Sequence, residues 1–221
     1  MNTMSTVELQ IAERARSYPD EPLTNLTSFI DLALLNRSLD ALNKKGAPGV
    51  DGQPWSEYNE RRERRLPELL AQFKSGRCRA PAIRRTYIPK GDGKQQRPPG
   101  LPAVEDKVLQ MAVAKVLAPV YEQPFYGNSY GFRPGKSRHQ ALEALFKEVS
   151  FTGKYYIIDA DMANYFGSID HGRLRELAGL RIKDGVIRRM IDKWLKAGVL
   201  EAGRLTTRKK APRKEESSPR C

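Results

Sequence analysis

Apolar residues recur at helical spacing along much of the chain. The stretch that begins at Val104 repeats them at intervals of three and four, and it predicts a helix that Pro119 ends or bends. Other helices are expected over residues 7–19, 56–74, 138–149 and 186–197. Four apolar residues share one face of a further helix, predicted over residues 25–45: Leu26, Phe29, Ile30 and Leu34.

Two segments have the character of strands. Arg84 to Pro89 is strand-like, GDGK forms a turn, and the return arm carries Lys94 and Arg97. This pattern predicts a β-hairpin with basic residues on both arms. The apolar run from Tyr155 to Asp161 predicts a second strand, and Asp170 is placed to cap the helix that follows. The expected fold class is therefore α+β, with helices predominating.

The composition is that of a folded protein, with 39% hydrophobic and 29% charged residues. No apolar run reaches the roughly 18 residues of a membrane-spanning helix. Cys78 and Cys221 form neither a disulfide framework nor a four-ligand zinc site. We therefore expect a cytoplasmic protein without a membrane partner.

The net charge of +13 indicates a polyanionic partner. The last fourteen residues hold six basic and two acidic side chains, which leaves +9 for the rest of the chain. Nucleic acid is the simplest partner, although a solvated basic surface is the alternative. The same choice applies to RRERRL, whose Arg61, Arg62, Arg64 and Arg65 either track phosphates or form a solvated helical face.

The predicted strand at 155–161 carries two carboxylates with one residue between them. On a strand, Asp159 and Asp161 would project from the same face. Such a pair is repulsive unless a cation lies between the two groups, and magnesium prefers oxygen ligands of this kind. In a basic protein this points to phosphoryl or nucleotidyl transfer. Acids that only end a strand or cap a turn are the alternative.

The order of several motifs carries more information than any one of them. They are APGVDGQPW (47–55), YIPKGDGKQQRPPGLP (87–102), VEDKVLQMAV (104–113), SYGFRPGKS (129–137), DADMANYFGSIDH (159–171) and WLKAGVLEAGRL (194–205). Taken together, from about Leu35 to Leu205, the chain resembles the reverse transcriptases encoded by group II introns.

The resemblance implies a fold and a division of the chain. It implies the fingers and an incomplete palm of a right-hand polymerase, helix-rich, with a β-hairpin and a truncated antiparallel palm sheet. Residues 1–45 would be an N-terminal helical extension, residues 46–153 the fingers, and residues 154–207 the partial palm with the first catalytic motif. Residues 208–221 would be a disordered tail.

The resemblance also assigns roles around the predicted palm strand. Asp161 matches the family's first catalytic aspartate, because Phe166 stands five places later, as in the D-x-x-x-F-F pattern. Its carboxylate would bind both Mg²⁺ ions of a two-metal centre, and the carbonyl of Met162 would bind one of them. Phe166 would lie beneath the incoming sugar and select deoxynucleotides, unless it is a core aromatic. Asp159 would be a structural acid.

Basic residues of the fingers would bind the nucleotide. Lys90 and Arg97, seven residues apart across the hairpin turn, would both contact the triphosphate unless they are only a surface pair. Arg133 would contribute to the nucleotide or template pocket, or else form a structural ion pair. His139 and His171 are helix-start residues rather than ligands. The implied partners are RNA, a DNA primer and deoxynucleoside triphosphates.

The family's later motifs are absent from the sequence. A Q-G-G block and a second palm motif, which supplies the other catalytic aspartates, should follow Thr206. The tail RKKAPRKEESSPRC admits a codon assignment that, read two nucleotides later, gives E-E-G-T-P-Q-G-G-V-I-S-P-L. We therefore expect a frameshift just after Thr207, and we expect this chain to be inactive alone. Sequencing the gene tests this expectation, because codons that do not yield Q-G-G would refute it.

Three hypotheses follow from the sequence. The chain is a fragment of an RNA-directed DNA polymerase, a non-catalytic maturase-like protein that binds intron RNA, or a degenerate product without a present role.

Overall fold

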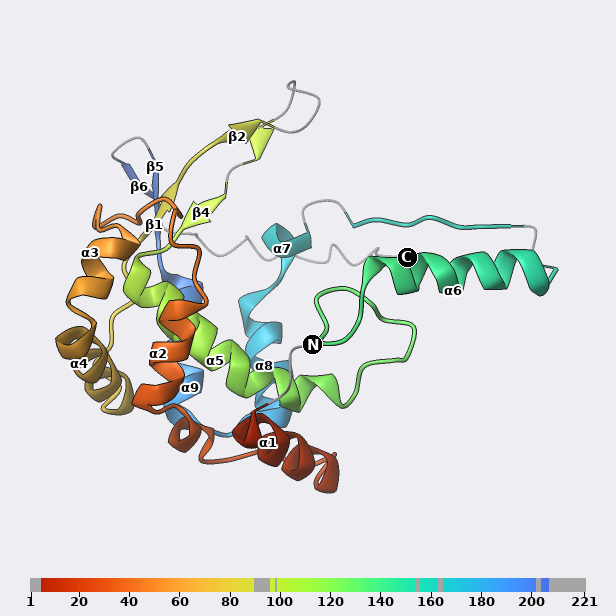
Figure 1. Cartoon of the computed structure of the whole chain (residues 1–221), viewed down its shortest axis with the longest axis horizontal. Coiled ribbons are helices and arrows are strands. Elements are labelled where there is room, and N and C mark those ends of the chain that lie inside the picture. The colour runs from red at the N-terminus through yellow and green to blue at the C-terminus, as the bar shows by residue number, and fades with distance from the viewer. Residues whose placement is uncertain are drawn as a thin grey trace, which may run out of the picture. The chain divides into compact units, whose positions relative to one another are not determined.

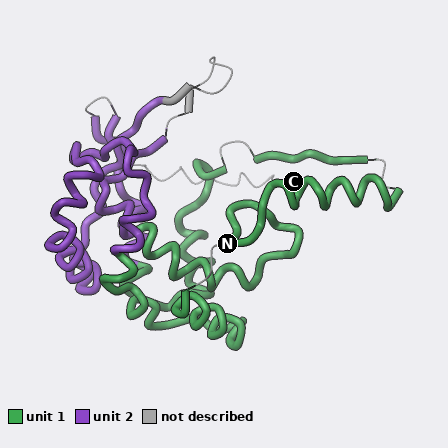
Figure 2. The backbone as a smooth tube through the Cα atoms, in the orientation of Figure 1, with its two compact units in different colours: residues 1–35, 110–188 green, residues 36–109, 189–221 purple. Residues whose placement is uncertain are grey.

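The structure is a computed structural model that describes residues 5–89, 96–97, 99–153, 156–162, 165–201 and 204–206, with the backbone alone at 88–89 and 96–97. The chain divides into two compact units, shown in Figure 2. Unit 1 comprises residues 1–35 and 110–188, and unit 2 comprises residues 36–109 and 189–221. The boundaries fall within three helices (Figure 1): α2 (Leu32–Asp40), α5 (Val104–Glu122) and α9 (Gly185–Lys196).

Unit 1 is helical in the part that the structure describes. Its remaining helices are α1 (Thr6–Ser17), the 3₁₀ helix η1 (Leu26–Phe29), α6 (Arg138–Phe151), α7 (Tyr165–Ser168) and α8 (His171–Arg181). Local signals explain where several of them begin. Ser5 and Glu8 form a capping box at α1, Ser137 and Gln140 form one at α6, and Asp170 accepts a hydrogen bond from the Arg173 amide at 2.8 Å. The predicted cap at Asp170 is confirmed.

Asp184 ties the N-terminal segment of unit 1 to the start of α9. It is 6% exposed and accepts hydrogen bonds from the Thr27 amide at 2.8 Å and the Thr27 hydroxyl at 2.7 Å. The amides of Val186 and Ile187 donate to the same carboxylate. Burial opposes the charge, but these hydrogen bonds outweigh it and lower the pKa of Asp184.

Unit 2 contains short helices and the described strands. Its other helices are α3 (Trp55–Glu60) and α4 (Arg62–Lys74). α4 contributes Leu66, Leu69 and Phe73 to the core, each at most 3% exposed. The GAPGVDG turn lies against the chain just before α5, where a Cβ on Gly49 would come within 2.5 Å of the Ala103 backbone. Only glycine therefore fits at this position.

Two of the predicted helices are interrupted. The helix expected over 25–45 is η1 followed by α2, because the Asp31 carboxylate accepts the Leu34 amide at 2.7 Å and starts a new helix there. The segment 56–74 is α3 and α4, separated at Arg61. Pro119 lies inside α5, which continues to Glu122, so it does not end that helix.

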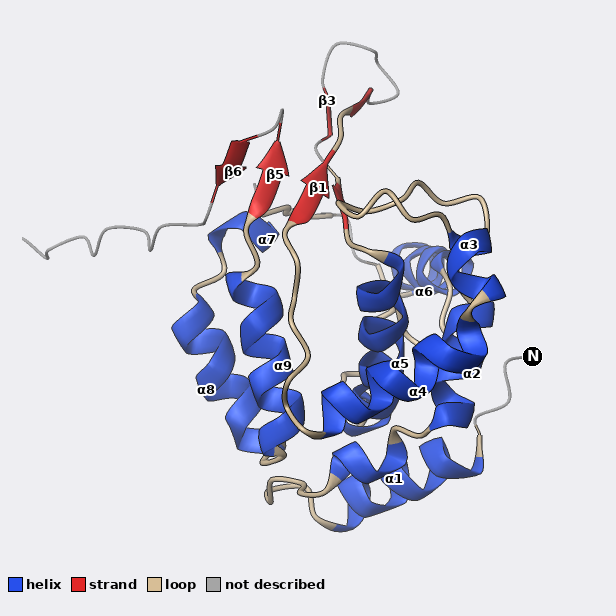
Figure 3. Cartoon of the chain, turned by 90° about the vertical axis from the view of Figure 1, so that its left-hand side faces the viewer, coloured by secondary structure: helices blue, strands red, loops and turns tan. Residues whose placement is uncertain are grey.

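The basic hairpin is confirmed as a pair of short ladders (Figure 3). β1 (Ile83–Arg85) pairs with β4 (Gly100–Leu101), and β2 (Ile88–Pro89) pairs with β3 (Gln96–Arg97), both antiparallel. β1 also pairs in parallel with β5 (Val199–Glu201), which forms a hairpin with β6 (Arg204–Thr206). This sheet has the order β4-β1-β5-β6, and its last two strands were not predicted.

The strand predicted at 155–161 is wrong for the residues described there. Residues 156–161 have no strand assignment and are exposed, with Tyr156 94% and Ile158 92% exposed. A strand needs a neighbour to complete its backbone hydrogen bonds. No strand of the described chain pairs with this segment, so the expected antiparallel palm sheet is not formed there. The broad α+β class holds, because helices accompany a small mixed sheet.

Candidate nucleotide and nucleic-acid site

The basic hairpin belongs to unit 2. Its two outer strands place the Arg97 backbone opposite Ile88, so the two arms pair as the predicted hairpin requires. The side chain of Arg97 and the whole of Lys90 lie outside the described residues. Their joint contact with a triphosphate therefore stays a prediction, although the ladder that would bring the two arms together is present.

Asp161 and Met162 lie in an exposed loop of unit 1. Met162 is 70% exposed, and Asp159 and Asp161 are also open to solvent. Over the described ranges, no group of three or more His, Cys, Asp or Glu side chains could hold a metal ion. One or two solvent-exposed carboxylates leave most of the oxygen ligands of Mg²⁺ to be supplied by other groups. These residues do not by themselves fit a two-magnesium centre.

Phe166 lies on the short helix α7 and is 81% exposed. Its ring meets that of Tyr165 edge-on, with the centroids 5.3 Å apart. The alternative in which Phe166 is a core aromatic is therefore wrong in this structure. An exposed aromatic side chain remains free to lie against a sugar or a base, but that contact stays a prediction.

Arg133 forms the structural ion pair that the sequence left open. Its side chain is 9% exposed, and its Nε and Nη2 donate to one Glu122 oxygen at 2.9 and 2.6 Å. Nη1 donates to the carbonyls of Tyr126 and Ser129, and the guanidinium lies over the Phe125 ring. The residue fixes the loop after α5, so its predicted contact with a nucleotide has no geometric support. Nothing local in the sequence indicated Glu122 as its partner.

The arginines of RRERRL have different environments. Arg61 and Arg64 are exposed and face Glu57 and Glu68 at 3.6 Å. Arg62 instead donates to Asn36 and Asp40, which ties α4 to α2. Pairs at 3.6 Å between exposed side chains are weak. Arg61 and Arg64 therefore remain available to a polyanion, whereas Arg62 is committed to the fold.

Comparison with known proteins identifies the family. The profile described as "Reverse transcriptase (RNA-dependent DNA polymerase)" matches residues 88–217, more than half of the chain. This stretch contains the hairpin arm from Ile88, Asp161 and Phe166, and it runs into the tail for which the frameshift is predicted.

Relatives with known names point the same way. Group II intron-encoded protein LtrA of Lactococcus lactis subsp. cremoris is 38% identical over 63% of this chain and 23% of its own length. Protein YkfC of Escherichia coli (strain K12) is 34% identical over 73% of this chain and 44% of its own length. Nuclear intron maturase 1, mitochondrial, of Arabidopsis thaliana is 24% identical over 43% of this chain and 13% of its own length.

This chain thus spans less than half the length of each of these relatives. Within the ranges that the structure describes, no helix is both long and apolar enough to cross a membrane. The motif order, the basic hairpin and the family match agree. The chain belongs to the reverse transcriptase family, in the branch of group II intron-encoded reverse transcriptases and maturases.

Proposed function

We propose that this chain is the fingers and the first part of the palm of a group II intron reverse transcriptase, an RNA-directed DNA polymerase. The family match over residues 88–217 carries the proposal. In it, residues 46–153 form the fingers and residues 154–207 the partial palm, after the helical extension of residues 1–45. The partners would be an RNA template, a DNA primer and deoxynucleoside triphosphates.

The proposed roles divide between the two units. In unit 2, Lys90 and Arg97 would bind the triphosphate through charge-assisted hydrogen bonds from the two arms of the hairpin. In unit 1, Phe166 would lie beneath the incoming sugar, a role that its exposure permits. Asp161, with the Met162 carbonyl, would be one ligand of Mg²⁺. Its companion ligands are not among the described residues, so we propose that the chain alone does not synthesise DNA.

Primer extension on an RNA template with Mg²⁺ tests this proposal. We expect no product above the enzyme-free reaction, while a commercial reverse transcriptase extends the same primer. Robust extension that Asp161→Ala abolishes would contradict the proposed inactivity and would support the polymerase role of Asp161. Extension that survives Asp161→Ala would indicate a contaminating polymerase.

A non-catalytic role in binding intron RNA is the second candidate. It is favoured by the +9 charge outside the tail and by the exposed Arg61 and Arg64 of unit 2. Contacts from such side chains to phosphates release counterions, so affinity for single-stranded RNA should fall steeply between about 50 and 200 mM salt. Absence of measurable binding at the lower concentration would favour a product without a present role.

Substitutions test whether Arg61 and Arg64 contribute to the salt dependence of RNA binding. Replacing Arg61 and Arg64 by Ala should reduce the slope of log affinity against log salt by about 1 for each phosphate contact that is lost. Arg173→Ala on α8 is the matched control, because Arg173 is also exposed and paired with a glutamate on its own helix, Glu176. Equal slopes in all three proteins would mean that RRERRL is only a solvated face.

A further inference from the structure

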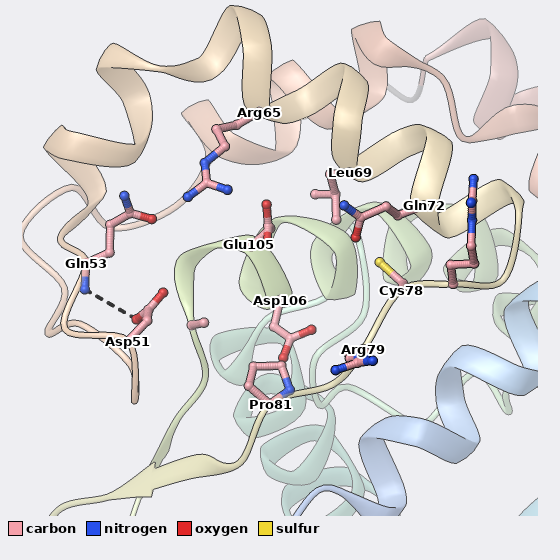
Figure 4. Close-up of a pocket in the computed structure, with 12 residues that line it drawn as sticks. Asp51, Gln53, Arg65, Leu69, Gln72, Cys78, Arg79, Pro81, Glu105 and Asp106 are labelled. Carbon is pink, nitrogen blue, oxygen red and sulfur yellow. Dashed lines mark hydrogen bonds between the residues drawn. The ribbon is translucent and has the colours of Figure 1, made fainter.

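A cavity of about 410 Å³ opens within unit 2, in a part of the chain that is distant in sequence from Asp161. Figure 4 shows it between α4, the loop that follows α4, the first turn of α5 and the GAPGVDG turn. The volume is that of a small-molecule site rather than of a single water. None of the roles proposed above uses it.

Arg65 and Glu105 face each other across this cavity. Figure 4 shows the guanidinium pointing down from α4 and the carboxylate pointing up from α5. No hydrogen bond or ion pair within 4.0 Å joins them in the described structure. Burial raises the pKa of Glu105, and the charge of Arg65 only partly opposes this rise. The cavity therefore has a charged hydrogen-bond donor, Arg65, on one side and a charged acceptor, Glu105, on the other.

The Nε atom of Arg65 is buried, and no described group accepts a hydrogen bond from it. An unpaired buried donor is uncommon and costs stability. Because Nε is closed off from solvent, a ligand in the cavity would meet the Nη atoms of Arg65. Among the described residues, the Glu105 carboxylate receives one long hydrogen bond, from the Tyr58 hydroxyl at 3.4 Å. The Nη atoms of Arg65 and the Glu105 carboxylate therefore both have hydrogen-bonding capacity left for a ligand.

The other residues that line the cavity include further charged and polar side chains. Arg77 and Arg79 follow α4 and are exposed at the cavity, and they form no ion pair with the described carboxylates. A pair of guanidinium groups is suited to a phosphate. Gln72 and Asp106 also line the cavity, and the Asp106 carboxylate already accepts the Trp194 indole N–H at 3.0 Å.

From this arrangement we propose that the cavity binds one guanine nucleotide. Arg65 donates to O6 and N7 of the base, Glu105 accepts from N1–H and N2–H, and Arg77 and Arg79 hold the phosphate. Arginine paired to O6 and N7 is the commonest specific contact to guanine. A carboxylate next to the arginine can bind the neighbouring N1–H and N2–H groups. Among the bases, guanine alone has two acceptors, O6 and N7, next to these two donors.

Other bases use the same groups less well. Adenine offers the carboxylate only its amino group and offers the arginine only N7. Cytosine likewise has one donor group, and uracil has no exocyclic amine. The source of the guanine is either a free nucleotide or an unpaired base of RNA, since protein sites that read RNA bind splayed-out bases on their edges. Only the RNA source rests on the proposed function.

Calorimetric titration of the full chain with GMP, IMP and AMP tests the site. We expect GMP to bind at least about tenfold more tightly than AMP, with IMP between them because it lacks the 2-amino group. Glu105→Gln should remove the preference for GMP. Arg79→Ala should weaken GMP but leave guanosine, which has no phosphate, unchanged.

Lys74→Ala is the matched control, because Lys74 is an exposed cation of α4 that does not line the cavity. Urea unfolding of each variant shows whether it is folded, and the comparison of three nucleotides on the unchanged protein does not depend on any variant. Equal affinity for GMP and AMP, or no binding at millimolar GMP, would overturn the proposal.

Two RNA oligonucleotides show whether the ligand is a free guanine nucleotide or an unpaired guanine base of RNA. A short uridine run with one guanine should bind more tightly than the all-uridine run if the ligand is an RNA base. Equal affinities of the two, with GMP still preferred over AMP, would assign the site to a free nucleotide. Failure of the proposed RNA function would instead appear as no binding of either oligonucleotide, whatever the mononucleotides do.

Discussion

Helices α4 and α6 have similar lengths and both carry apolar residues at helical spacing, but their surroundings differ completely. α4, with 13 residues in unit 2, buries Leu66, Leu69 and Phe73. α6, with 14 residues in unit 1, buries none; Leu142 is 62% and Phe146 63% exposed. The same local pattern therefore produces a core helix in one region and an open apolar face in the other.

The difference separates helix formation from burial. α6 forms with a capping box at Ser137 and an ion pair between Glu143 and Lys147 at 2.7 Å, both of which act within one turn. Burial of its apolar stripe needs a partner surface, and the described part of unit 1 does not supply one.

The largest expected effect is the difference in stability between alanine variants of a buried phenylalanine on α4 and an exposed one on α6. Phe73→Ala should lower the free energy of unfolding by about 3–5 kcal/mol, because it leaves a cavity beneath α4. Phe146→Ala should change it by less than about 0.5 kcal/mol, because the ring is already in water. Urea unfolding of both variants measures the contrast. A cost of several kcal/mol for Phe146→Ala would show that something covers α6 in solution.

The next largest effect is a dependence of stability on pH that arises from Asp106. Burial raises the pKa of Asp106 from 3.8 to about 6, and the hydrogen bond from Trp194 only partly offsets it. The Asp106 carboxyl loses its proton near pH 4 in the unfolded chain but near pH 6 in the folded chain. The free energy of unfolding therefore falls as the pH rises from 4 to 6. The loss amounts to about 3 kcal/mol, and no more is lost at higher pH.

Asp106→Asn checks this pH effect. The variant should remove that part of the pH dependence and be more stable relative to the wild type at pH 8 than at pH 4. Unfolding in urea at a series of pH values measures the difference. A constant difference between the two proteins from pH 4 to pH 8 would mean that Asp106 titrates as an exposed aspartate does.

A smaller effect is expected at the start of α6. Ser137→Ala removes the side chain that accepts the Gln140 amide, which should destabilise the helix by about 1 kcal/mol. Because α6 buries no side chain, the loss should appear as faster hydrogen exchange of its own amides rather than as a lower global stability. Asp170→Ala, at the cap of α8, provides a second capped helix for comparison.

The smallest effect concerns the exposed pair on α6. The hydrogen bond and the charge of Lys147 lower the pKa of Glu143, so the pair stabilises the helix at neutral pH and this contribution is lost as the pH falls through the pKa of the folded state. Glu143→Gln should raise amide exchange in α6 slightly at low salt and not at about 1 M salt. An effect that is independent of salt would point to packing instead.

Much of this protein follows from its sequence. Periodicity and caps predicted the helices at 7–19, 138–149 and 186–197, and the turn residues predicted the pairing of the arms of the basic hairpin. The order of the motifs identified the family that the profile match then showed. The helix and hairpin signals act between residues within a few turns of each other or along a short hairpin, and the motif order is read directly along the chain. Both can therefore be recognised without knowing the fold.

Other features needed the tertiary structure. β5 pairs with β1 although about a hundred residues separate them in the chain, and the predicted strand at 155–161 has no such neighbour. Likewise, the sequence did not show that Glu122 pairs with Arg133, or that Arg65 and Glu105 face each other without forming an ion pair. Pairing, burial and the pKa of a carboxyl depend on groups that only folding brings together, because water otherwise solvates each of them separately.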